Sequence, residues 1–246
     1  MQGLKELCSD ELQLVTAAPM NADRGKLSLP PDYDSDPERG CTFRAHWQED
    51  VHGPVADHLI SERLQPVLDV GCGIGRFGVA LGDRLDWIGV DVSPRQLSDC
   101  ARGPVVRADA DHLPFSDGSV GAVTMLWMLY HLNDPRTALA EAKRVLRPGG
   151  LLATCASSRA NDPELVPDGY PPTTFDAEEA ADITAAVFGA KQMEVVRWDI
   201  PLVRLGDRDE IAAYARGHLL PAAIVDTVEA PLTLTKRGCL VWARRP

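Results

Sequence analysis

The sequence lacks a run of apolar residues long enough to cross a membrane. Its first nineteen residues contain four leucines, but Glu6, Asp10 and Glu11 interrupt them. Acidic residues at such positions are foreign to the apolar centre of a secretory signal and to transit peptides. We therefore expect a cytoplasmic protein without a membrane span.

Grouped cysteines and an excess of basic residues are also missing. The six cysteines are scattered without the spacing of a metal site, and the histidines and acids form no clear ligand set. The chain has 25 Lys and Arg residues against 36 Asp and Glu residues, which gives a net charge of −11. Because no ligand set is visible, we expect no metal. A surface of this sign repels phosphate backbones, so we also expect no nucleic-acid partner.

Apolar runs and helical patterns alternate along the chain. Its 246 residues, 45% of them hydrophobic, suffice for one α/β domain with a sizeable core. The alternation predicts a doubly wound, Rossmann-like parallel sheet. Strands are expected at residues 67–70, 87–91, 105–106, 120–126, 151–155, 194–200 and 239–244.

A glycine-rich loop follows the first expected strand. The segment Val67–Gly78 has the sequence VLDVGCGIGRFG, with glycines at positions 71, 73 and 75. Glycine lets the backbone approach a ligand closely, and the start of the following helix offers unpaired N–H groups. Strand, loop and helix therefore predict a nucleotide-binding corner, although the pattern G-x-G-x-x-G alone also fits dinucleotide enzymes.

Two carboxylates narrow the choice of ligand. Asp69 lies two residues before Gly71, at the mouth of the loop, where it would repel a pyrophosphate but suits a cationic amino group. Asp91 ends the second strand, 20 residues after Gly71, which is the spacing of a carboxylate that binds ribose hydroxyls. These features predict an adenosine whose far end is positive, a description that S-adenosylmethionine fits.

Five motifs in order extend this pattern: VLDVGCGIG, IGVDVSP, VRADADHLPFSDGSVGAV, MLYHLNDP and RVLRPGG. Over residues 60–156 the chain resembles class I S-adenosylmethionine-dependent methyltransferases, most of all the ubiquinone and menaquinone type, whose members methylate small molecules. The resemblance implies a sheet of about seven strands with the last strand antiparallel. It also implies S-adenosylmethionine as cofactor and S-adenosylhomocysteine as product.

The resemblance assigns the cofactor-binding residues one by one. Val92 would pack on the adenine ring, and Asp109 with Ala110 would meet the edge of that ring. Leu126, at the end of the fourth strand, would lie beside the methyl group. Together with the loop and the two carboxylates, the expected set is Asp69, Gly71, Gly73, Gly75, Asp91, Val92, Asp109, Ala110 and Leu126.

A catalytic base is needed only when the acceptor is a hydroxyl or a protonated amine, because the methyl carbon is already activated. His131 follows the fourth strand at the reaction end, and an ordinary histidine pKa of about 6.5 suits proton abstraction near neutrality. His46, which precedes Trp47, is the second candidate. A packing or capping role for His131 stays open at this point.

We expect residues 1–246 to form a single methyltransferase domain. Residues 1–60 are the expected N-terminal lid, residues 61–156 the cofactor-binding core, and residues 157–246 an acceptor-side insert with the C-terminal strands. The insert is irregular and proline-rich at residues 157–175, which favours a second lid segment over the acceptor.

The acceptor is expected to be a small molecule, such as a specialised metabolite, that is methylated at oxygen or nitrogen. Its pocket would be lined by aromatic side chains. The protein is expected to be a monomer or a homodimer. The expected pocket residues are Trp47, Trp127 and Tyr130.

Three other functions stay open. Cys155, preceded by Thr154, resembles the attacking cysteine of RNA cytosine methyltransferases, but the Pro-Cys motif that those enzymes carry after the fourth strand is missing. A nicotinamide dehydrogenase fits the glycine pattern but not Asp69 or the later motifs. The last alternative is an inert subunit that binds S-adenosylmethionine without chemistry.

Overall fold

The computed structural model describes residues 51–246 of the chain. The predicted base His46 and the predicted acceptor contact Trp47 lie outside the described residues, as does most of the expected N-terminal lid. Among the residues that are described, every helix is too short or too polar to cross a membrane.

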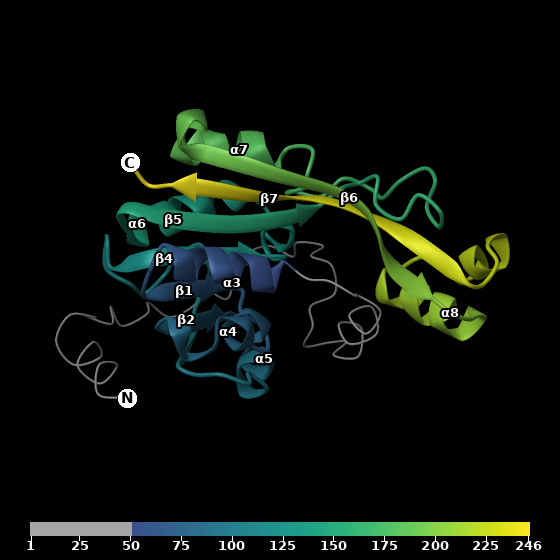
Figure 1. Ribbon diagram of the computed structural model, residues 1–246, viewed down its shortest axis with the longest axis horizontal. Coiled ribbons are helices and arrows are strands. Elements are labelled where there is room, and N and C mark those ends of the chain that lie inside the picture. Colours follow the sequence, from purple (N-terminus) through teal and green to yellow (C-terminus); the bar gives the residue numbers. More distant parts are fainter. Residues whose placement is uncertain (1–50) are drawn as a thin grey trace.

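A seven-stranded sheet forms the centre of the described part (Figure 1). The strand order is β3-β2-β1-β4-β5-β7-β6, in which β1 to β5 run parallel and β7 runs antiparallel to both neighbours. The order reverses between β1 and β4, which confirms the doubly wound fold with an antiparallel last strand. The strands are β1 (Val67–Val70), β2 (Trp87–Asp91), β3 (Val105–Arg107), β4 (Val120–Leu126), β5 (Leu146–Ser157), β6 (Met193–Leu205) and β7 (Leu232–Arg244).

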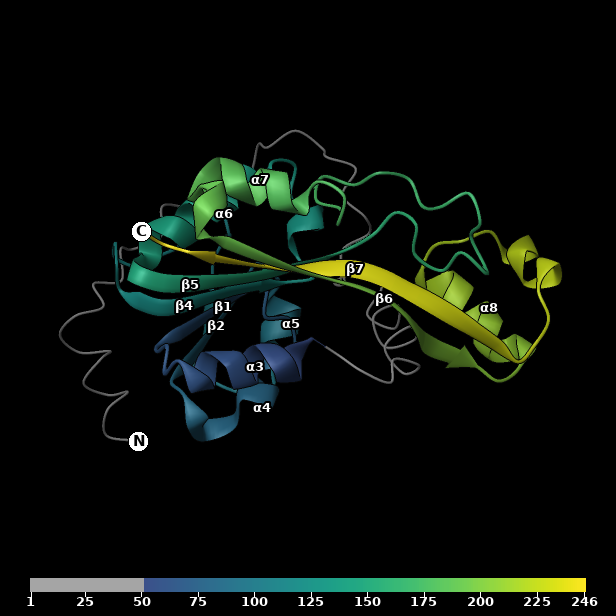
Figure 2. The same ribbon diagram turned by 45° about the horizontal axis from the view of Figure 1, so that its top comes forward.

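Helices cover both faces of the sheet. Figure 2 shows α3, α4 and α5 on one face, and α6 and α7 on the other. Strands β1 and β4 are buried along their whole length, because central parallel strands pack against helices on both sides. The α-helices are α3 (His52–Ser61), α4 (Arg76–Leu81), α5 (Pro94–Ser98), α6 (Pro135–Val145), α7 (Ala180–Phe188) and α8 (Arg208–Gly217).

Two helices begin at a capping residue that a proline follows. Ser93 and Asp134 each accept a hydrogen bond from a backbone N–H in the first turn of α5 and α6, and each is followed by a proline. Asp176 and Glu179 have the spacing of a capping box, but the Asp176 side chain does not cap α7. That carboxylate instead accepts hydrogen bonds from the backbone N–H and the hydroxyl of Thr173, and α7 begins four residues later.

The last two strands are much longer than expected. Strands β6 and β7 stay paired along their whole length, whereas β5 pairs with β7 only up to Gly238. The hairpin therefore projects past the ends of the parallel strands and carries α8 (Figure 1). Pro201 hid this continuation, because proline usually marks a strand end; a register shift between Pro201 and Val203 accommodates it.

A separate small core with a buried ion pair stabilises the projecting hairpin. Lys236 Nζ donates to Asp162 Oδ1 at 2.8 Å and to Tyr214 Oη at 2.6 Å, and all three side chains are buried. Burial lowers the pKa of Lys236, while the Asp162 carboxylate opposes this shift. The ion pair joins the irregular insert to β7. The apolar residues of this core are Leu165, Val203, Leu205, Ile211, Tyr214 and Leu234.

Candidate functional site

The glycine loop runs from the end of β1 to the start of α4. Its three alternate glycines all have left-handed backbone conformations, with φ of 72° at Gly71, 54° at Gly73 and 81° at Gly75. A Cβ atom at Gly71 would lie 2.7 Å from Cβ of Met128, and one at Gly75 would lie 2.5 Å from Sγ of Cys100. Conformation and space therefore both require glycine here, as the sequence predicted.

Hydrogen bonds attach the loop to the end of β2. The backbone N–H groups of Gly71 and Cys72 both donate to the carbonyl of Val90, at 2.7 and 3.0 Å. The N–H of Gly73 donates to Asp91 Oδ2 at 2.9 Å. These hydrogen bonds fix the position of the loop between β1 and β2, next to the carboxylate that ends β2.

Asp91 makes contacts through both of its carboxylate oxygens. Its Oδ1 atom accepts the backbone N–H of Ser93 at 2.9 Å, and the side chain is half-buried. The neighbouring Val92 is 49% exposed, which is unusual for a large apolar side chain and leaves a flat surface beside the carboxylate.

Asp69 lies beneath the loop and not at its mouth, where the sequence placed it. The side chain is 2% exposed; Oδ1 accepts the hydroxyl of Thr124 at 2.7 Å, and Oδ2 accepts the indole N–H of Trp87 at 3.3 Å. Burial raises the pKa of Asp69 to about 6, and the Thr124 hydrogen bond opposes that shift. Asp69 would therefore attract a positively charged ligand across the loop without touching it.

The loop after β3 brings Asp109 and Ala110 to the same edge. The N–H of Ala108 donates to the carbonyl of Asp91 at 3.1 Å, which places the start of this loop beside the end of β2. Asp109 Oδ1 accepts the N–H of Asp111 at 3.0 Å, and the Ala110 side chain is buried. These residues sit on the side of Asp91 away from the glycine loop.

A tight corner follows β4. Leu126 is buried at the strand end, and Trp127 then adopts φ of 60°. A left-handed backbone costs a bulky residue about 1–3 kcal/mol, and such strain is concentrated at functional sites. The short 3-10 helix η2 (Leu129–His131) completes the corner, and the rings of Tyr130 and His131 lie 4.4 Å apart between centroids.

The corner packs directly on the glycine loop. Met128, which the sequence analysis did not single out, fills the space next to Gly71. The insert after β5 returns to the same place, because the hydroxyl of Thr174 donates to the carbonyl of Leu132 at 2.6 Å. His131, predicted as a base, is therefore framed by the loop on one side and by the insert on the other.

Trp198 of β6 is a second aromatic residue that the sequence analysis missed. Its ring lies edge-on to that of Trp127, with centroids 6.0 Å apart and an interplanar angle of 71°. No local pattern marked it, since its neighbour Trp127 lies 71 residues earlier in the sequence. Among the predicted acceptor contacts, Trp127 and Tyr130 lie at this corner.

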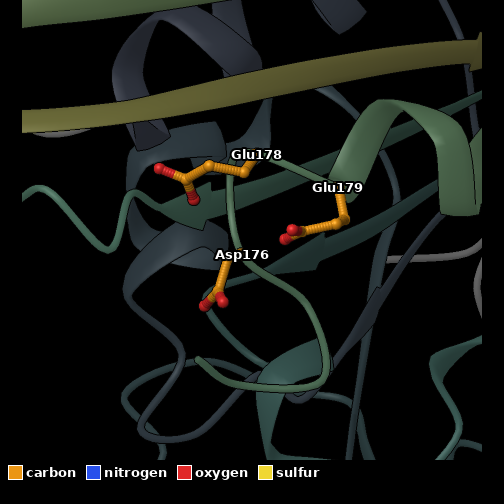
Figure 3. A group of neighbouring side chains, drawn as sticks. All are labelled: Asp176, Glu178 and Glu179. Carbon is orange, nitrogen blue, oxygen red and sulfur yellow. The ribbon is translucent and has the colours of Figure 1, made fainter. Parts of the chain in front are cut away.

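Three acidic side chains gather on the segment that leads into α7 (Figure 3). Arg159 pairs with all three: its Nη2 donates to Glu179 Oε1 at 2.5 Å, and its Nε lies 3.7 Å from Asp176 and from Glu178. We assign the group a role in fixing the insert.

Cys155 is fully buried within β5, between Leu126 of β4 and Leu240 of β7. A nucleophilic cysteine must reach its substrate and form a thiolate. The position of this thiol inside the sheet therefore argues against attack on a nucleic-acid base.

The sequence of this chain is similar to those of known methyltransferases. The family described as "methyltransferase domain" matches residues 68–154, from β1 to β5. The O-methyltransferase rstn1 of Aspergillus nomiae is 37% identical over 133 residues, which cover 49% of this chain and 59% of that protein. The demethylmenaquinone methyltransferase of Lactiplantibacillus plantarum is 33% identical over 138 residues, which cover 50% and 56%. The chain thus spans little more than half the length of these relatives.

The fold is shared more widely than the sequence. The crystal structure of the [4+2]-cyclase SpnF superposes with a TM-score of 0.57, covering 87% of this chain and 94% of that one, at 19% identity. Sheet order, glycine loop and sequence match together make residues 68–154 similar to the methyltransferase domain of class I S-adenosylmethionine-dependent enzymes. A cyclase with this fold also shows that the fold alone does not define the reaction.

Proposed function

We propose that the protein transfers the methyl group of S-adenosylmethionine to an oxygen or nitrogen of a small molecule. The observation that carries the proposal is the convergence of the glycine loop, Asp91 and the corner after β4 at one edge of the sheet. That edge is where open α/β sheets bind ligands.

The residues present fit the cofactor. The left-handed glycines leave bare backbone for the methionine part, and Asp69 beneath them supplies negative charge toward its amino group. Asp91 ends β2 beside the loop, which is the place of a carboxylate that binds ribose hydroxyls. The exposed Val92 offers a surface for adenine, with Asp109 and Ala110 at its edge and Leu126 near the methyl group.

In the proposed reaction the acceptor lone pair attacks the methyl carbon in line with the sulfonium, which leaves as the thioether of S-adenosylhomocysteine. The protein aligns the acceptor, excludes water and removes the acceptor proton. His131 takes that proton on its imidazole, which lies at the corner between loop and insert. His46 is the alternative base.

Three observations support a small acceptor. The net charge of −11 disfavours a polyanion. Cys155 is buried. Two curated relatives carry names of O-methyltransferases, and a third methylates demethylmenaquinone. Oxygen is therefore the first atom to test, with nitrogen second. We place the protein in the cytoplasm, as a monomer or homodimer.

The proposal is tested with methyl-labelled S-adenosylmethionine, purified protein and whole-cell extract, with the product divided by size and by nuclease sensitivity. Label in the small-molecule fraction, accompanied by S-adenosylhomocysteine, is the expected result. Label in nuclease-sensitive polymer would refute the small-molecule assignment. Cofactor binding without label in any extract would favour the inert subunit.

A further inference from the structure

The Trp198 ring lies over Gly238 of the neighbouring strand β7 and packs against the margin of a hydrophobic core. In the sheet it pairs with Gly238 of β7, which in turn pairs with Ser157 of β5. A Cβ atom at Gly238 would lie 2.3 Å from Cζ2 of Trp198 and 2.6 Å from the carbonyl oxygen of Ala156. Only glycine leaves room for the indole ring at this position.

The ring lies at the reaction end of the sheet. Ser157 is the last residue of β5. Trp198, which is aligned with Ser157 through Gly238, therefore lies at the carboxyl edge of the parallel strands. Leu126 of β4 pairs with Cys155, two residues earlier on β5. Trp198 therefore stands next to the corner after β4, which agrees with its edge-on contact to Trp127.

Both tryptophans keep part of their surface open, and apolar neighbours extend that surface. Val196 and Ile200, which share the face of Trp198 by strand alternation, are 45% and 37% exposed. Trp127 contacts Trp198, and the exposed Val196 and Ile200 flank Trp198 on the same face of β6.

We propose that the side chains of Trp127 and Trp198 form one wall of the acceptor-binding site. This wall selects a planar aromatic acceptor that carries a phenolic hydroxyl. Gly238 sets the specificity, because it leaves room for the Trp198 ring. The inference rests on the proposed function and names its substrate class. Two indole rings meeting edge to face leave one ring face for stacking and one ring edge for a T-shaped contact. A flat ring uses both contacts, whereas a saturated ring of equal size uses neither. A phenolic proton is also acidic enough for transfer to an imidazole.

The test measures binding of 1-naphthol and of its saturated counterpart, decahydro-1-naphthol, to protein saturated with S-adenosylhomocysteine. Calorimetry should show at least tenfold tighter binding of the aromatic probe. Trp198→Leu should remove that preference, and Trp198→Phe should restore part of it. Val195→Ala is the matched control, because Val195 is a similarly exposed residue of β6 on the opposite face.

Gly238→Ala provides a second variant that keeps both tryptophans. Its methyl group displaces the Trp198 ring, so the aromatic preference should fall at least fivefold while the dissociation constant for S-adenosylhomocysteine stays within twofold. Equal binding of the two probes to the wild-type protein, or an unchanged preference in Trp198→Leu, would overturn the inference. Methyl transfer to a non-aromatic component of the extract would overturn the inference and leave the proposed function intact. A wild-type protein that does not bind the cofactor would refute both.

Discussion

Lowering the pH from 7 to 5 should weaken cofactor binding through a single buried carboxyl, Asp69. An exposed aspartate stays ionised across this range, because its ordinary pKa is about 4. Burial beneath the glycine loop raises the pKa of Asp69 to about 6. The group is therefore mostly ionised at pH 7 and mostly protonated at pH 5, which removes its attraction for the positive charge of the cofactor.

The size of the effect follows from the pKa. A carboxyl with a pKa of about 6 is about 90% ionised at pH 7 and about 10% ionised at pH 5. If the cofactor gains only from the ionised form, its dissociation constant rises about tenfold, which corresponds to about 1.4 kcal/mol. The raised pKa has the opposite effect on the stability of the free protein. The folded state binds the proton more tightly than the unfolded chain, so this group adds to the free energy of unfolding as the pH falls toward 5.

Calorimetry with S-adenosylhomocysteine and S-adenosylmethionine at half-unit steps of pH measures the effect. Asp69→Asn should bind weakly at every pH and show a flat profile. The charge of His52 lowers the pKa of Asp69, so His52→Gln serves as a control for that contribution. A change of less than twofold in the wild-type protein, or an equal pH dependence in Asp69→Asn, would refute the role of this carboxyl.

Three other substitutions have expected outcomes. His131→Ala should lower turnover by about a hundredfold or more while the cofactor dissociation constant stays within twofold, measured as S-adenosylhomocysteine release; full activity would move the base elsewhere. Gly71→Ala, which forces a Cβ against Met128 at a left-handed φ, should abolish cofactor binding and lower the thermal midpoint. Lys236→Met leaves the buried Asp162 charge unpaired and should cost about 3–5 kcal/mol in urea unfolding, whereas adding Asp162→Asn should recover part of that loss.

Most of the cofactor half could be predicted from the sequence. There the determinants are local: Gly71, Gly73 and Gly75 alternate over five residues, and Asp91 ends a strand that β1 pairs with directly. The caps at Ser93 and Asp134 likewise lie directly before a proline at the start of a helix. Such patterns survive folding because each needs only its own neighbours in the chain.

The acceptor half could not be predicted in the same way. The contact between Trp127 and Trp198 depends on the register of β6 against β7, which the sequence does not reveal. Pro201 concealed the length of the hairpin, and Asp176 formed a turn instead of a helix cap. Asp69 was expected at the mouth of the loop, but its burial depends on Thr124 from a neighbouring strand.

The most direct test of the account is a calorimetric titration of S-adenosylmethionine into the wild-type protein, Asp91→Ala and Asp99→Ala. Asp99 is an exposed acid at the end of α5 and controls for the loss of one negative charge. We predict one binding site in the wild-type protein and in Asp99→Ala, and at least a hundredfold weaker binding in Asp91→Ala. Equal affinity in all three proteins, or no binding to the wild-type protein, would contradict the assignment of this edge as the cofactor site.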